Sequence, residues 1–171
     1  MIRELTVNHH EHISDLPYED VVASFMEVTG SVEEGYDGVA SSAQTKEDFE
    51  RIFKRREGSS GFMRFLTVDH GGWLSNFGKA PKAMMVVLGN PLIAITMIKH
   101  DIRVGLNVPV RIYIYEGADG RTRVAYDLPS TLMSGLDGAD VAEAARKLDA
   151  KLIAVAETIS SGEAEPTASD S

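Results

Sequence analysis

The stretch AMMVVLGNPLIAITM, residues 83–97, decides the fold of this chain. Residues 83–88 form a continuous apolar run, which is typical of a central strand covered on both faces. Gly89 and Asn90 then end the strand, and Pro91 fits the first position of a helix that Asn90 can cap. Residues 92–98 are apolar almost all round, so this helix is expected to be deeply buried or covered by a partner chain.

Further strands are expected on both sides of this stretch. Residues 62–68 are rich in aromatic and β-branched residues and predict a strand. Residues 109–116 and 121–127 predict a hairpin around the pair Asp119-Gly120, which favours a two-residue type I′ turn. Such a turn would place Tyr113 opposite Tyr126, and both tyrosines on the same face of the sheet.

Helices are expected near both ends of the chain. One should begin near Ser14 or Asp15 and stop at Gly30, and a second should begin at a capping-box-like pair, Thr45 and Asp48. Apolar residues three and four apart predict a last helix over residues 140–159. The remaining expectations are a short first strand at residues 2–8, a loop at 30–44 and a disordered tail at 161–171.

Length and composition indicate one globular domain, residues 1–160. The 171 residues are 43% hydrophobic and 25% charged, which suffices for a real core. A formal net charge of −9 argues against nucleic-acid partners and against an anionic membrane surface. The chain has no cysteine and no visible signal peptide, so a cytoplasmic location is expected.

The order of several short motifs resembles the family called Domain of Unknown Function 302. Asp69-His70 ends one strand, Gly89-Asn90-Pro91 opens a helix, and Tyr126-Asp127 ends the hairpin. An apolar-Pro-apolar step, residues 108–110, leads into that hairpin, and the resemblance covers roughly residues 59–132.

The resemblance implies a compact two-layer α/β domain of the α+β type, with a mainly antiparallel sheet covered by helices. It also implies a homodimer. From the residues themselves, we expect either the apolar helix at 92–98 or the tyrosine-bearing sheet face to be the interface. The resemblance implies no catalytic residues that could be carried over. Many relatives carry a histidine shortly after the last hairpin strand, where this chain has residues 133–136, MSGL.

The leading functional hypothesis is a domain that binds or senses a small molecule. Its pocket is expected to be lined by polar and aromatic residues at strand ends and on the hairpin, namely His70, Asn90, Arg111, Tyr113 and Tyr126. Arg111 and the tyrosines could hold a carboxylate or a planar ligand. Each of these residues also has a structural interpretation, as a cap or as cover for the sheet.

Two alternatives for His70 remain open. Imidazole could ligate a non-covalent haem or a divalent metal, or it could act as a general acid or base oriented by Asp69 or another acceptor. His10 and His12 alternate along the chain and could share a metal if they lie on a strand. No nucleophile elbow and no H-E-x-x-H sequence occurs, so the familiar hydrolase and metalloprotease templates are unsupported.

Overall fold

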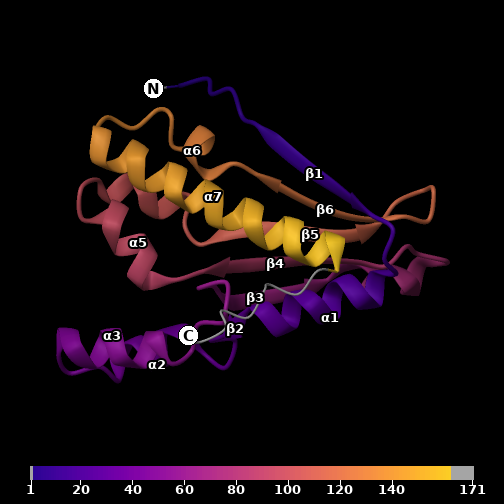
Figure 1. Cartoon of the computed structure of the whole chain (residues 1–171), viewed down its shortest axis with the longest axis horizontal. Coiled ribbons are helices and arrows are strands. Elements are labelled where there is room, and N and C mark those ends of the chain that lie inside the picture. Colours follow the sequence, from indigo (N-terminus) through magenta and orange to yellow (C-terminus); the bar gives the residue numbers. More distant parts are fainter. Residues whose placement is uncertain (1, 163–171) are drawn as a thin grey trace, which may run out of the picture.

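The fold is a six-stranded sheet with helices on one face, seen in a computed structural model that describes residues 2–162. The strands run in the order β1 (His9–Ser14), β6 (Thr122–Asp127), β5 (Val110–Glu116), β4 (Ala83–Gly89), β3 (Met63–Asp69) and β2 (Gly30–Ser31) (Figure 1). Neighbouring strands are antiparallel except for β2, which runs parallel to β3. The prediction of a mixed domain with a mainly antiparallel sheet is confirmed.

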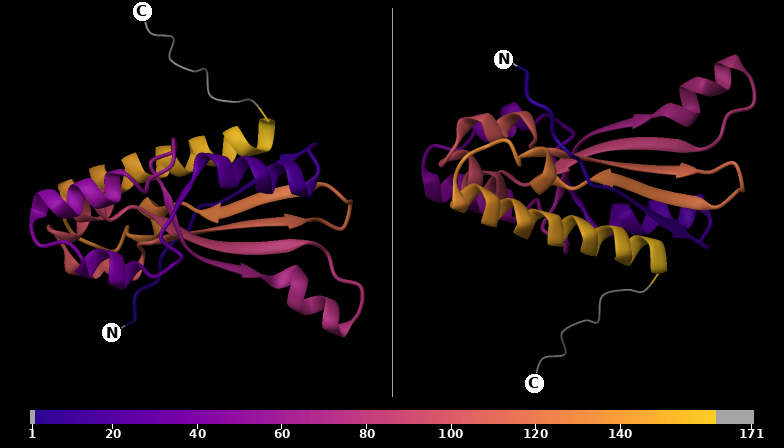
Figure 2. Two further views of the ribbon diagram at one scale, coloured as in Figure 1. Left: turned by 90° about the horizontal axis from the view of Figure 1, so that it is seen from below. Right: turned by 90° about the horizontal axis from the view of Figure 1, so that it is seen from above.

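Two long helices cover the same face of this sheet. They are α1 (Tyr18–Val28) and α7 (Ala139–Ser161), which also contact each other (Figure 2). Three helices gather at the end of the sheet where β4 stops: α2 (Tyr36–Ser41), α3 (Lys46–Lys54) and α5 (Pro91–Ile98). Short helical turns complete the chain: α4 (His70–Leu74), η1 (Ser75–Phe77), η2 (Ile102–Leu106) and α6 (Pro129–Leu132).

The main core lies between the sheet and the two long helices. Alternate residues of the central strands point into it and are buried: Met84, Val86, Leu88, Val110, Ile112, Ile114, Val124 and Tyr126. Their neighbours on β4, Met85 and Val87, point to the opposite face and are only half-buried. The prediction that residues 83–88 are covered on both faces is therefore wrong for this chain, because helices cover one face alone. We call the uncovered side the open face.

The two ends of the expected element list also differ from the structure. The first strand is His9–Ser14 rather than residues 2–8; it is mostly polar and pairs with β6 at the edge of the sheet. The segment expected to be a loop, residues 30–44, contains β2 and α2. Tyr36 of α2 packs against the rings of Phe53 and Phe65, which gives this polar segment its own small core.

The expected helices are otherwise found. Thr45 caps α3 by accepting a hydrogen bond from the Asp48 amide at 3.1 Å, as its sequence predicts. The last helix extends to Ser161, so the first residue of the predicted tail is helical, and residues 163–171 lie outside the described residues. Among residues 2–162, no helix is both long enough and apolar enough to cross a lipid bilayer.

The hairpin turn differs from its prediction in a way that matters for the site. The Gly117 amide donates to the Arg121 carbonyl at 2.8 Å, so three residues form the loop, and Gly120 adopts a positive φ of 77°. Tyr113 consequently pairs with Ala125 rather than with Tyr126. A shift of one residue moves a side chain to the other face of a sheet, so Tyr126 lies under the helices while Tyr113 lies on the open face.

Beneath the helices, Tyr126 meets two histidines from the edge strand β1. Its hydroxyl lies 2.9 Å from His12 Nε2 and 3.4 Å from His10 Nδ1. Burial, followed by the nearby carboxylates of Glu157 and Asp149, raises the pKa of Tyr126 to about 12. Burial also lowers the pKa of His12, with Glu157 acting in the opposite direction and His10 in the same one.

This lowered pKa predicts a pH-dependent stability. The unfolded chain takes up a proton at His12 near the ordinary value of 6.5, before the folded chain does, so acid favours unfolding. The contribution of His12 is complete above about pH 6.5 and is lost as the pH falls through its folded pKa. Urea unfolding between pH 8 and pH 5 should show this loss. His12→Gln should remove that part of the slope, and an unchanged slope in the variant would contradict the assignment.

Candidate functional site

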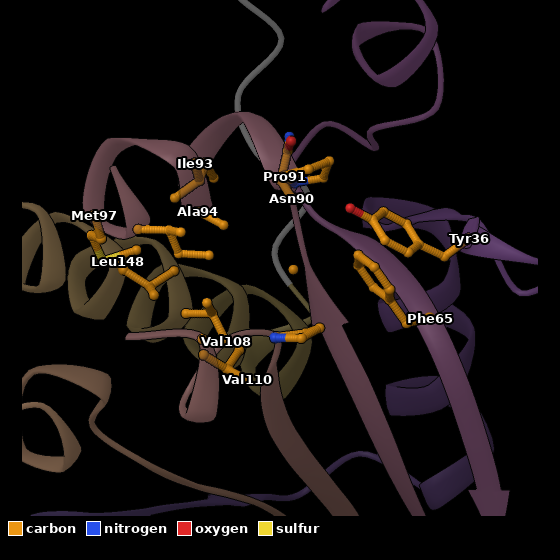
Figure 3. A pocket seen from close by; sticks show the side chains of 14 residues that line it. Tyr36, Phe65, Asn90, Pro91, Ile93, Ala94, Met97, Val108, Val110 and Leu148 are labelled. Carbon is orange, nitrogen blue, oxygen red and sulfur yellow. The ribbon is translucent and has the colours of Figure 1, made fainter. Parts of the chain in front are cut away.

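An apolar hollow lies beside α5, where β4 ends and β5 begins (Figure 3). Its volume is about 320 Å³, which is at the lower end of the range for small-molecule sites. Aliphatic and aromatic side chains from four elements form its walls: Phe65, Ile93, Ala94, Met97, Val110 and Leu148, with Tyr36 at one side. We call it the α5 pocket.

Asn90 contributes a wall of the α5 pocket, but its polar atoms are already occupied. The side-chain oxygen accepts from the Leu92 amide at 2.8 Å and so caps α5. The amide nitrogen donates to Glu57 at 2.7 Å and to the Gly61 carbonyl at 2.8 Å. The residue is only 5% exposed, so its role is to join α5 to the chain before β3.

The hydroxyl of Tyr36 is the polar group that the α5 pocket leaves free. It points into the pocket and forms no hydrogen bond within residues 2–162 (Figure 3). Burial, followed by the charge of Asp37, raises the pKa of Tyr36, so the hydroxyl keeps its proton at neutral pH. The pocket therefore offers apolar walls and one hydroxyl able to donate or accept a hydrogen bond.

His70 lies elsewhere, at a corner of the open face. It is the first residue of α4, and its Nδ1 accepts a hydrogen bond from the Trp73 indole at 3.0 Å. Its ring meets that of Tyr113 edge-on, with 6.0 Å between the centroids. Asp69 caps α4 by accepting from the Gly72 amide at 2.8 Å, so no hydrogen bond between Asp69 and His70 orients the imidazole.

The other half of the open face carries charged side chains. Tyr115 stacks on Tyr113 and donates a hydrogen bond to Glu11, and this bond, followed by burial, raises its pKa to about 12. Arg123 lies between Glu11 and Asp119 and pairs with both carboxylates. Arg111 also projects from this face, but it forms no ion pair within the described part of the chain.

The five residues expected to share one pocket are thus distributed over three places. His70 and Tyr113 do meet, and Arg111 lies on the same open face. Asn90 lines the α5 pocket, and Tyr126 is on the opposite side of the sheet. Residues 2–162 contain no group of three or more histidine, aspartate or glutamate side chains placed to hold a metal ion.

Sequence reasoning missed most of the α5 pocket. Tyr36 gave a faint signal, since it is a lone aromatic residue in a polar segment. Phe65, Ile93 and Leu148 come from a strand and two helices that are far apart in the chain, and each reads as ordinary core. Only the packing of these elements shows that space remains between them.

Comparison with solved structures confirms the fold. The crystal structure of an uncharacterized conserved protein DUF302 from Bacillus stearothermophilus is similar, with a TM-score of 0.61. The match covers 87% of this chain and 95% of that one, at 13% sequence identity.

Two Brucella proteins share part of the sequence. Fluoride-specific ion channel FluC 1 from Brucella suis biovar 1 is 24% identical over 114 residues, which are 66% of this chain and 44% of that protein. Fluoride-specific ion channel FluC 2 from Brucella melitensis biotype 1 is also 24% identical, with 42% of its length covered. The chain therefore spans less than half the length of these relatives.

The model of one protein family matches most of the chain. Its description is "Domain of unknown function DUF302", and the match extends over residues 38–159. These residues include the α5 pocket except Tyr36, the hairpin and most of α7. This chain belongs to the DUF302 family.

Proposed function

We propose that this chain is a small-molecule-binding domain that acts as a homodimer. The α5 pocket is the observation that supports ligand binding, because a concave, mostly apolar space with one free polar group is the usual form of such a site. A cytoplasmic role as a sensor or carrier fits the absence of cysteine and the acidic composition.

The chemistry of the α5 pocket selects for a compact apolar ligand with one hydroxyl. Charged ligands would lose their hydration without gaining a counter-ion, since no charged side chain lines the pocket. A ring or branched aliphatic group would contact Ile93, Met97 and Leu148. One ligand hydroxyl could bond the free hydroxyl of Tyr36, which fixes the orientation of the ligand.

The geometry gives less support to the alternatives that involve His70. One imidazole nitrogen is occupied by Trp73, and His70 does not line the α5 pocket. Asp69 is engaged in capping α4 and does not position the ring as a general base requires. Haem or metal ligation and acid–base catalysis by His70 therefore rank behind binding in the α5 pocket.

The ligand site can be tested with p-cresol and toluene, which differ by one hydroxyl. We expect p-cresol at millimolar concentration to raise the thermal unfolding midpoint, and toluene to raise it less. At a hundred times its dissociation constant a ligand stabilises by about 2.7 kcal/mol. Tyr36→Phe should make the two compounds stabilise the protein equally. The stabilisation by p-cresol should fall by about 1 kcal/mol, because its hydrogen bond to Tyr36 is lost.

A variant that fills the pocket provides the control. Ala94→Phe should abolish the stabilisation by p-cresol, because its ring would occupy the space between Ile93 and Met97. Ala150→Phe places the same ring on an exposed position of α7 and should leave the stabilisation unchanged. Equal stabilisation of wild type and Ala94→Phe would exclude the α5 pocket as the binding site.

The open face supports the homodimer. Its apolar side chains are contiguous across the strands, since Leu66 pairs with Val87 and Val68 with Met85. Leu66 is 52% exposed, and Trp73 at the corner of the face is 49% exposed. A second copy of the chain would bury this surface by face-to-face packing of two sheets, the arrangement that gives β-sandwiches their core.

A charge placed in this surface should disrupt the dimer. Leu66→Lys would have to bury an ammonium group in the interface, so we expect the dimer dissociation constant to rise by about a hundredfold, or about 2.7 kcal/mol. Sedimentation velocity across a range of protein concentrations measures it. Ile102→Lys changes a residue of η2 that is more exposed, at 79%, and should leave the mass unaltered. A monomeric wild type, or a dimer that tolerates Leu66→Lys, would exclude this interface.

A further inference from the structure

A second hollow lies on the open face, beside the start of β5. Its volume is about 210 Å³, and it shares only Pro109 and Val110 with the α5 pocket. Besides these two shared residues, the hollow is lined by two charged residues, Arg111 and Asp127, by the polar Asn107, and by the apolar Val87, Leu106 and Leu132. We call it the Arg111 hollow.

The two charged residues belong to neighbouring strands. Tyr113 of β5 pairs with Ala125 of β6. Arg111 is two residues before Tyr113 and Asp127 is two residues after Ala125, so in an antiparallel pair both project from the same face. Their charged atoms nevertheless form no ion pair, although both side chains line the same hollow.

Each of the two charges has hydrogen-bonding capacity left. The side chain of Arg111 makes no hydrogen bond or ion pair in the part of the chain that the structure describes, so its whole guanidinium is available. Asp127 accepts one hydrogen bond on Oδ1, from His9 Nδ1 at 2.8 Å, and its Oδ2 accepts none from the described residues. The hollow thus presents a positive donor and a negative acceptor next to apolar side chains.

We propose that the Arg111 hollow binds a small zwitterion, an α-amino acid with an apolar side chain. The guanidinium of Arg111 would take the carboxylate through two parallel hydrogen bonds. The ammonium group would donate to Asp127, and the side chain of the ligand would lie against Val87, Leu106 and Leu132. Leu106 is 90% exposed without a ligand, so a bound side chain would cover apolar surface that now faces water.

Both charges of the ligand are needed for this fit. A simple carboxylate would be attracted by Arg111 but repelled by Asp127. A simple amine would be attracted by Asp127 but repelled by Arg111. An amino acid satisfies both groups and adds no net charge to a chain that carries −9. This site is separate from the α5 pocket, but it shares Val87 with the surface assigned to the dimer, so binding here would compete with face-to-face dimerisation.

Isothermal titration with L-leucine and two of its derivatives tests the proposal. N-acetyl-L-leucine keeps the carboxylate but lacks the ammonium group, and L-leucinamide keeps the ammonium group but lacks the carboxylate. We expect L-leucine to bind, and each derivative to bind about tenfold to a hundredfold more weakly, the range for losing a hydrogen bond to a charged group.

Variants of the protein separate the two contacts. Arg111→Gln should weaken L-leucine binding to the same degree as loss of the ligand carboxylate, and Asp127→Asn to the same degree as loss of the ammonium group. Arg146→Gln is the matched control, since Arg146 is an exposed arginine of α7 without an ion pair in residues 2–162, and it should leave binding unchanged. The mass of each sample is measured in parallel, so that a change in dimerisation is recognised separately.

Three results would overturn the proposal. The first is no heat of binding for L-leucine at millimolar concentration. The second is binding of N-acetyl-L-leucine as tight as that of L-leucine, which would make the hollow a plain carboxylate site. The third is an unchanged affinity in Arg111→Gln, which would place the amino acid elsewhere on the protein.

Discussion

The covering of the sheet on one face only is the constraint on which this structure depends. α1 and α7 bury alternate residues of the central strands, and the residues between them are left on a face without helices. An antiparallel sheet is stable with one face exposed to water when the side chains of that face are polar. Here β3 and β4 contribute apolar residues to that face, namely Leu66, Val68, Met85 and Val87. In a single chain these side chains stay partly exposed to water.

The same constraint separates three kinds of site. The open face, which no helix of the same chain covers, carries His70, Tyr113 and Arg111. The groups beneath the helices are shielded from solvent. There the Tyr126 hydroxyl is hydrogen-bonded to His12 of the edge strand. The α5 pocket belongs to neither face, because it forms at the end of the sheet where α5 turns over the last residues of β4. Binding in the α5 pocket and self-association through the open face can therefore occur in different parts of one small domain.

The sequence predicted the central elements well, because their signals are local. Asn90 and Pro91 mark the start of α5, and Thr45 marks α3, through capping chemistry that needs no tertiary contact. The face on which Tyr126 lies could not be predicted, because it depends on one loop residue. Asp119-Gly120 favours a two-residue turn, yet Ala118 joins the loop and the register of β6 changes by one. Tyr126 then exchanges faces with Ala125, and no property of Tyr126 itself reveals this.

The fluorescence of Trp73 tests most directly whether the open face is a contact surface. It is the chain's single tryptophan and lies half-exposed at the corner of that face, against His70. Acrylamide quenching is measured while the protein concentration is raised through the monomer–dimer transition. If the open face is the contact surface, quenching becomes weaker as dimers form, because a second sheet covers the indole ring. Quenching that stays constant while the measured mass doubles would contradict this assignment and place the interface on another surface.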